Sequence, residues 1–156
     1  MLDNYKQQSL AIELIKRKAR ITTIQKATGL SVKWLRQAFR EYHGYSARSG
    51  NDKQSIEALT RTNRQYKEVT LFAVCYQASE MINHDGHIQN IIQAFDVYKM
   101  LCPSSRLDFA DAVMVSKDLK DQKIQLTNCP NCGAVVLIGA RESYPEKCTV
   151  CRRVMS

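Results

Sequence analysis

Apolar residues recur every three or four positions along most of this chain, which is the period of an amphipathic α-helix. The spacing predicts four longer helices, over residues 5–19, 55–83, 88–101 and 107–120. Ile82 and Leu101 are expected to be the last buried positions of the second and third of these helices. The only predicted strand is the β-branched run at Val135–Ile138, so the expected fold class is mainly α.

Start and stop signals predict two shorter helices between residues 20 and 43. Thr22-Thr-Ile-Gln25 has the form of a capping box, and Gly29 can take the left-handed conformation that ends a helix. Ser31 can then cap a helix that runs to about Tyr42. A short helix, a turn with glycine and a helix of about three turns together predict a helix-turn-helix.

The second of these helices divides into two faces at 100° per residue. The apolar positions, which are Leu35, Ala38, Phe39 and Tyr42, fall together. The opposite face carries four candidate DNA contacts: Lys33, Arg36, Gln37 and Arg40. Arg binds guanine and Gln binds adenine in the major groove, and Arg36 at the centre of the face is the expected base contact. A packing helix can also show such a face without binding anything.

Basic residues crowd the end of the first helix. They are Lys16, Arg17, Lys18 and Arg20, and we expect them to contact phosphates without reading sequence. Residues 1–64 hold 13 Lys and Arg against 5 Asp and Glu, whereas residues 65–156 hold 10 of each. All of the excess charge of +8 therefore lies in the N-terminal part. This favours a polyanionic partner, nucleic acid first and an anionic membrane surface second, although solubility alone could explain it.

Two C-x2-C pairs near the C-terminus have the spacing of a tetrahedral zinc site. The pairs are Cys129 with Cys132 and Cys148 with Cys151, and fifteen residues separate them. Four thiolates leave no position open for water, so one structural Zn²⁺ per chain is expected in a small zinc ribbon. A pair of disulfides, or four free buried thiols, are the alternatives, but no apolar secretory signal is found at the N-terminus and a cytoplasmic location is expected.

The same signals predict four regions along the chain. They are an N-terminal helix with the helix-turn-helix over 1–44, a linker over 45–54, a helical core or partner-binding region over 55–122, and the zinc ribbon over 123–156. No nucleophile stands beside a base, no glycine loop suits a phosphate, and no metal site is open. The sequence therefore does not indicate an enzyme.

The order of these blocks resembles the FlhC family, the C subunit of the bacterial flagellar master transcriptional activator, and its relatives on conjugative elements. The resemblance runs from about Leu10 to Arg153. Its carriers are Leu10–Leu14, Thr28–Ser31 through Gly44, Ala94–Tyr98 with Cys102-Pro103, and the two cysteine pairs. Apart from Arg152 and Arg153, the family's basic C-terminal tail is missing, and residues 43–53 lack its proline-rich stretch. Both departures favour a divergent or mobile-element relative.

The resemblance implies a bacterial activator that binds double-stranded promoter DNA and forms a hetero-oligomer with a smaller, FlhD-like helical subunit. It also implies recruitment of RNA polymerase and carries the four cysteines over as zinc ligands. The DNA contacts rest on helix geometry alone. A zinc-ribbon adaptor that assembles proteins without base readout is the alternative, and an RNA-binding ribbon is disfavoured because clustered exposed aromatics are lacking.

Overall fold

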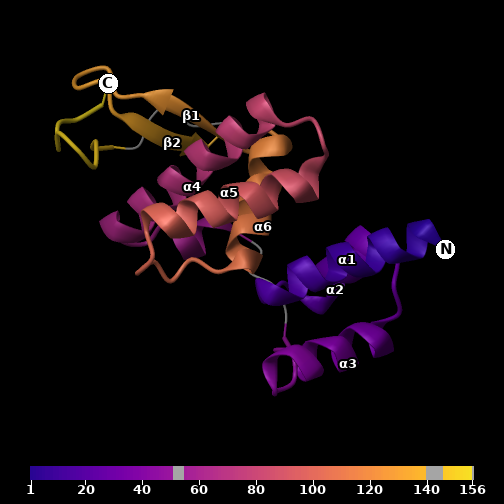
Figure 1. Ribbon diagram of the computed structural model, residues 1–156. Coiled ribbons are helices and arrows are strands. Elements are labelled where there is room, and N and C mark those ends of the chain that lie inside the picture. Colours follow the sequence, from indigo (N-terminus) through magenta and orange to yellow (C-terminus); the bar gives the residue numbers. More distant parts are fainter. Residues whose placement is uncertain (51–54, 140–145, 156) are drawn as a thin grey trace. The chain divides into compact units, whose positions relative to one another are not determined.

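The computed structural model describes residues 1–50, 55–139 and 146–155. The described chain forms two compact units (Figure 1). The first unit contains residues 1–52 with 108–110, and the second contains residues 53–107 with 111–156. Residues 51–54 of the predicted linker and residues 140–145 of the predicted ribbon lie outside the described residues.

The first unit is built from three helices. They are α1 (Leu2–Lys16), α2 (Ile21–Thr28) and α3 (Val32–His43). Their shared core consists of Ala11, Leu14, Ile15, Ala19, Ile24, Leu35 and Phe39, all of which are buried. His43 Nε2 also lies 2.7 Å from the carbonyl oxygen of Ile15, which joins the end of α3 to α1. The short connection between α2 and α3 and the packing of both helices on α1 give the predicted helix-turn-helix.

The end of the first helix differs from the prediction of residues 5–19. The helix α1 ends at Lys16, because Lys18 takes a left-handed conformation with φ 59°. The N–H groups of Lys18 and Ala19 donate to the carbonyls of Ile15 and Leu14, at 2.9 and 3.1 Å. This pair of bonds is a Schellman motif, which here forms without the usual glycine and so gave no sequence signal.

The predicted capping box at Thr22 is wrong. The helix α2 begins at Ile21, two residues earlier than a cap at Thr22 would place it, with Arg20 at the N-cap and no side-chain cap. Its predicted end is confirmed, since Gly29 has φ 73°. The start of α3 is also confirmed, because the Ser31 hydroxyl accepts a bond from the Trp34 N–H. The left-handed Gly44 ends α3.

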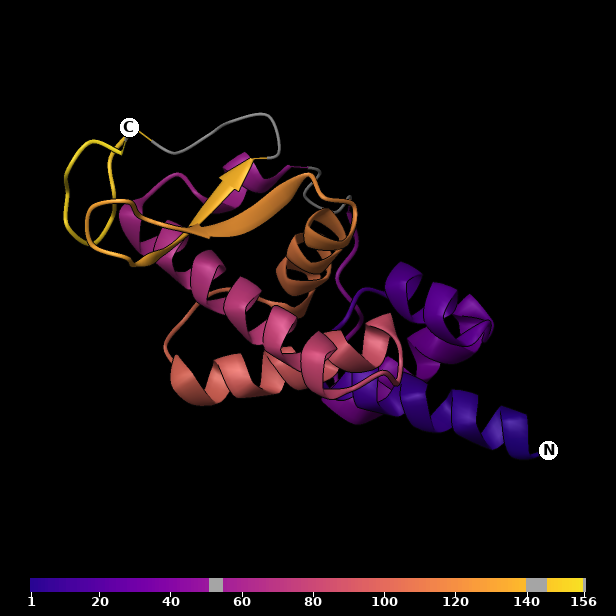
Figure 2. The ribbon, with the colours of Figure 1, turned by 90° about the horizontal axis from the view of Figure 1, so that it is seen from above.

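The second unit contains the remaining elements. They are the 3-10 helix η1 (Ile56–Leu59), the helices α4 (Asn63–Ile82), α5 (His87–Leu101) and α6 (Phe109–Lys120), and the strands β1 (Ile124–Asn128) and β2 (Val135–Gly139). The strands pair antiparallel, with Leu126 opposite Leu137. Figure 2 shows this hairpin running beside α4. The first two residues of α6, Phe109 and Ala110, belong to the first unit, and the rest of α6 from Asp111 on belongs to the second.

The predicted helix over residues 55–83 is interrupted. A break at Thr60–Thr62 separates η1 from α4, and Thr62 and Gln65 form a complete capping box. The capping-box signature is present in the sequence. However, Ile56 and Leu59 precede it at helical spacing, so the apolar period predicted one continuous helix. The strand β1 was not predicted, because it has only five residues and their burial does not alternate.

A tyrosine hydroxyl fastens the hairpin to α4. Tyr66 in the first turns of α4 donates to the carbonyl of Leu137, and the Leu137 N–H donates back to the same hydroxyl at 3.0 Å. Leu137 is buried, and burial raises the pKa of Tyr66. One side chain thus satisfies both backbone groups of Leu137 on the side of β2 that does not face β1.

Two predicted burials are wrong. Ile82 is 76% exposed and Leu101 is 62% exposed. Both lie in the last turn of a helix, directly before the C-cap residue that ends the helix. The core between α4 and α5 instead centres on Phe72, Tyr76, Ile91 and Tyr98. In the described part of the chain, no helix is both long and apolar enough to span a membrane.

Candidate metal centre and nucleic-acid interface

The two cysteine pairs fold into turns with the same hydrogen bonds. In each turn, the sulfur of the first cysteine accepts a hydrogen bond from the backbone N–H of the residue two positions later. These bonds are Asn131 N to Cys129 Sγ at 3.4 Å and Val150 N to Cys148 Sγ at 3.3 Å. The carbonyl of the first cysteine also accepts a hydrogen bond from the N–H four residues later. These donors are Gly133, at 2.9 Å from the Cys129 oxygen, and Arg152, at 3.0 Å from the Cys148 oxygen. These bonds give the two turns the same backbone shape, and both turns present two sulfurs on one side.

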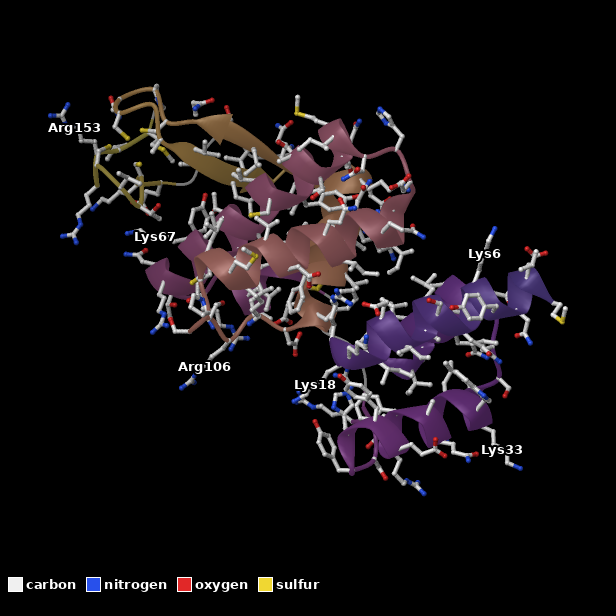
Figure 3. The ribbon with its side chains drawn as sticks, in the orientation of Figure 1. Lys6, Lys18, Lys33, Lys67, Arg106 and Arg153 are labelled. Carbon is white, nitrogen blue, oxygen red and sulfur yellow. The ribbon has the colours of Figure 1, made fainter. Side chains whose placement is uncertain are left out.

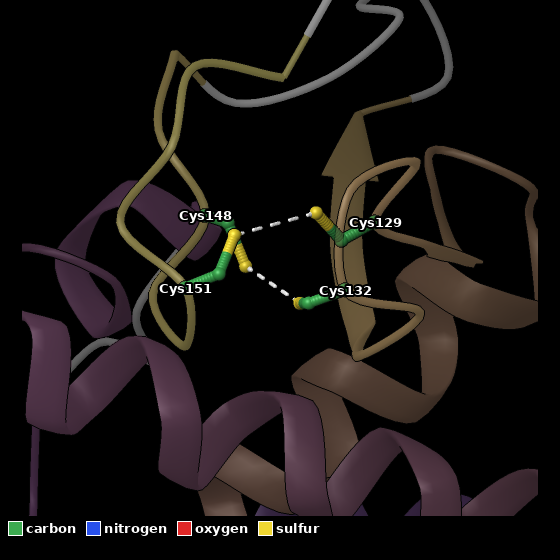
Figure 4. Close-up of side chains that lie close together, drawn as sticks. All are labelled: Cys129, Cys132, Cys148 and Cys151. Atoms are coloured by element: carbon green, nitrogen blue, oxygen red, sulfur yellow. Dashed lines mark hydrogen bonds between the residues drawn. The ribbon is translucent and has the colours of Figure 1, made fainter.

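The four sulfurs converge from these two turns (Figure 4). All four Sγ atoms lie within 4.8 Å of one another, with Cys129 to Cys151 at 3.9 Å and Cys132 to Cys148 at 3.7 Å. A tetrahedral site with metal–sulfur bonds of about 2.3 Å places its sulfurs about 3.8 Å apart. These distances exceed the ~2.05 Å of a disulfide, so the arrangement fits four ligands of one metal ion.

The electrostatics of this cluster favour a cation. Backbone N–H groups of Cys151 and Val150 lower the pKa of the Cys148 thiol to about 6. The Arg153 N–H acts in the same sense on Cys151, but burial and the neighbouring sulfurs outweigh it and raise the pKa of that thiol to about 11. The Cys148 thiolate therefore forms readily, and its negative charge opposes deprotonation of the next thiol. A divalent cation removes this opposition, because metal binding draws the remaining protons off.

A small apolar core surrounds the cysteines of the cluster. It consists of Cys129, Val136, Ile138, Cys148 and Met155, with Cys151 packed against it. Three of these six residues are metal-ligand candidates. The core is therefore too small to hold the two turns together when the sulfurs have no ion between them.

The helix α3 presents the predicted polar face. Lys33, Arg36, Gln37 and Arg40 are all exposed, while Leu35 and Phe39 on the other side are buried. Tyr42 is wrongly placed by the helical pattern, since it is 55% exposed. Figure 3 shows Lys33 extending away from the body of the first unit, at the start of α3. The exposed face runs the full length of the helix and carries three cations.

The four basic residues after α1 have different surroundings. Lys16 and Arg17 both bind Glu13, at 3.0 and 2.9 Å, and these bonds lower the pKa of that carboxyl, Arg17 having the larger effect. Lys18 is exposed and lies 5.8 Å from the ring centre of Tyr45. Arg20 donates to the carbonyl of Arg48 at 3.4 Å. Exposed ion pairs are weak, so the bonds to Glu13 do not prevent Lys16 from meeting a phosphate.

Comparison with known protein families gives the family of this chain. The model of the flagellar transcriptional activator family, FlhC, matches residues 1–155. The chain belongs to the FlhC family. No curated protein matches the chain. The family is one of transcriptional activators and not of enzymes, and the expected family resemblance is confirmed over essentially the whole length.

The two turns of this FlhC-family chain differ in the residue that follows the second cysteine, and this difference yields a prediction. The residue after each second cysteine is left-handed, with φ 75° at Gly133 and φ 60° at Arg152. A left-handed backbone destabilises a residue that has a Cβ by roughly 1–2 kcal/mol. Glycine avoids this strain, but it loses more conformational entropy on folding, so the net gain is smaller. We expect Arg152→Gly to stabilise the metal-loaded protein by about 0.5–1 kcal/mol, measured by chemical denaturation.

Gly133→Ala is the matched control for this prediction. A Cβ at Gly133 would meet no atom within 4 Å, so backbone strain alone should destabilise this variant by about 1 kcal/mol. Changes of the same sign in both variants would contradict the explanation.

Proposed function

We propose that this chain is the DNA-binding subunit of a bacterial transcriptional activator, held in its fold by one structural Zn²⁺ at Cys129, Cys132, Cys148 and Cys151. The proposed DNA-binding part is residues 1–44. Its candidate contacts are Lys33, Arg36, Gln37 and Arg40 on α3, with Lys16, Arg17, Lys18 and Arg20 on the phosphate backbone. The observation that carries the proposal is the exposed basic face of α3, which is the second helix of a helix-turn-helix.

Zinc is the metal that this donor set favours. Four thiolates in tetrahedral spacing suit Zn²⁺, and two sulfurs accept backbone N–H bonds that hold them in place. The four thiolates of the described cluster fill all four positions of a tetrahedral ion, so no position stays open for a substrate. The ion would therefore supply folding free energy to residues 124–155 and take no part in a reaction.

Exposed apolar side chains on the second unit support a protein partner. Val74, Met81 and Ile82 are exposed on α4, with Met81 at 82%, and Val97, Met100 and Leu101 are exposed on α5. Large apolar groups in contact with water often mark interaction surfaces. We assign the region 55–122 to contacts with a FlhD-like subunit in a hetero-oligomer that recruits RNA polymerase in the bacterial cytoplasm.

Selection of bound fragments tests the proposal. Sheared host DNA is incubated with zinc-loaded protein, alone and with a candidate D-type subunit, over a salt series. We expect a shared motif upstream of genes, sharpened by the partner and lost at high salt, because each phosphate contact contributes about −0.9 to the slope of log K against log salt. Random fragments, or none, would favour the adaptor, whose apolar contacts respond weakly to salt.

One substitution isolates base readout. Gln37 donates to Glu41 at 3.0 Å, so its amide is held in one orientation at the exposed surface. We expect Gln37→Ala to weaken binding to the selected duplex by about 1–3 kcal/mol and to leave a scrambled duplex unaffected, by fluorescence anisotropy. Lys26→Ala, an exposed change on α2, is the control. An equal loss on both duplexes would remove Gln37 from the base contacts.

A further inference from the structure

An open hollow of about 510 Å³ lies beside α3 within the first unit. It is lined by arginines from three segments: Arg20 before α2, Arg36 and Arg40 on α3, and Arg48 in the segment that follows α3. The hydroxyl residues Thr22 and Ser49 also line it. Among the described residues at this hollow there is no Asp or Glu. Four guanidinium groups around one small space make it strongly positive.

The position of the hollow divides the polar face of α3 into two rows. Val32, Arg36 and Arg40 are spaced four residues apart and all line the hollow. Lys33, Gln37 and Glu41 form the neighbouring row, which does not line it. The first row has two cations, whereas the charge of Lys33 in the second row is offset by Glu41. A phosphate is therefore attracted to the first row much more strongly than to the second.

The chemistry of the lining residues suits a phosphate group. Arginine donates two parallel N–H bonds to phosphate oxygens, and hydroxyl groups can complete the oxygen's partners. The segment 46–50 is held at the hollow by the bond from Arg20 Nη1 to the Arg48 carbonyl. This hydrogen bond is accepted by the backbone carbonyl of Arg48, so the guanidinium group of Arg48 takes no part in it.

We propose that this hollow binds one phosphate group of the DNA backbone, through Arg36, Arg40 and Arg48. The inference rests on the proposed function and divides it further: Arg36 and Arg40 hold the backbone, and Lys33 and Gln37 face the base edges. The expectation that Arg36 is the central base contact is thereby replaced. Arg48, which the sequence did not single out, joins the phosphate contacts.

Salt titration of Arg48→Ala tests the assignment. Zinc-loaded, full-length wild type, Arg48→Ala and Lys26→Ala are titrated with the selected duplex and with a scrambled duplex by fluorescence anisotropy. We expect Arg48→Ala to make the slope of log K against log salt shallower by about 0.9 and to weaken both duplexes by the same factor. Lys26→Ala, which does not line the hollow, should keep the wild-type slope. Arg36→Ala should behave as Arg48→Ala does, since both are exposed and line the same space.

The outcomes separate this inference from the proposed function. A wild type without DNA binding would refute the function itself. Steep salt dependence in the wild type with an unchanged slope in Arg48→Ala would overturn the hollow alone, as would an Arg36→Ala loss confined to the selected duplex.

A free phosphorylated compound is the other source of a phosphate group. Inorganic pyrophosphate, compared with chloride at equal ionic strength, should displace the wild type from both duplexes and displace Arg48→Ala less effectively. Pyrophosphate that shifts the backbone NMR signals of Ser46–Ser49 without displacing DNA would assign the hollow to a small ligand and overturn the inference.

Discussion

Replacing Cys132 with serine is expected to release the proposed zinc ion and to unfold residues 124–139 and 146–155. A hydroxyl is a poor zinc ligand, and three remaining thiolates do not close the tetrahedron. The apolar core of this region contains Cys129, Cys148 and Cys151 themselves, so little packing remains once the sulfurs separate. Metal binding contributes about 10–16 kcal/mol to folding in zinc-finger peptides, far more than this core could replace. The effect should therefore be the largest of any single substitution considered.

Metal content by mass spectrometry and backbone NMR spectra together measure this outcome. The helices α1 to α3 lie in a separate unit, and their signals should persist in the variant. Cys102→Ser is the control, because this cysteine is outside the cluster. Chelation of the wild type should reproduce the variant's spectrum, which keeps the test valid if Cys132→Ser is poorly expressed. A variant with full metal content and the wild-type melting temperature would refute a four-thiolate site.

Replacing Tyr66 with phenylalanine is expected to destabilise the second unit by about 2–4 kcal/mol. The Tyr66 hydroxyl is the partner of both the N–H and the carbonyl of the buried Leu137. Without it, two backbone groups lose their partner, at a cost of about 1–3 kcal/mol each when they stay buried. The ring still packs, so the loss reports hydrogen bonding and not a cavity.

Chemical denaturation measures the loss, and amide hydrogen exchange locates it. The Leu137 N–H should exchange faster in the variant, while amides of α5 change only as much as global stability does. Tyr5→Phe is a suitable control, because Tyr5 is 70% exposed. A loss below about 0.5 kcal/mol would mean that water replaces the hydroxyl, and that Tyr66 does not fasten the hairpin to α4.

Elements with their own local signal could be predicted from the sequence. Ser31 and Gly29 are a cap residue and a left-handed turn residue, and each sits where the structure places a helix boundary. The cysteine spacing is equally local, since each C-x2-C turn closes through its own backbone bonds. The fold class and the family follow from such signals, because their order along the chain needs no knowledge of long-range contacts.

Features that depend on distant residues could not be predicted. The end of α1 at Lys16 needs a left-handed lysine, which tertiary contacts stabilise and propensity disfavours. The bond between Tyr66 and Leu137 joins residues 71 positions apart. Arg48 follows α3 in a segment without apolar period, and only the folded chain places it beside Arg36 and Arg40. Its one sequence signal is a cation among small polar residues directly after a helix-turn-helix.

The spacing of the four sulfurs also sets how this protein must be handled. Two sulfur pairs, Cys132 with Cys148 and Cys129 with Cys151, each join one turn to the other. Thiols 3.7 and 3.9 Å apart need only a small approach to reach the ~2.05 Å of a disulfide when an oxidant is present. The lowered pKa of Cys148 supplies the reactive thiolate near neutral pH. If the metal leaves under air, oxidation of these pairs before the region unfolds would cross-link the two turns, and the cross-links would conceal the loss of metal unless a reductant is present throughout.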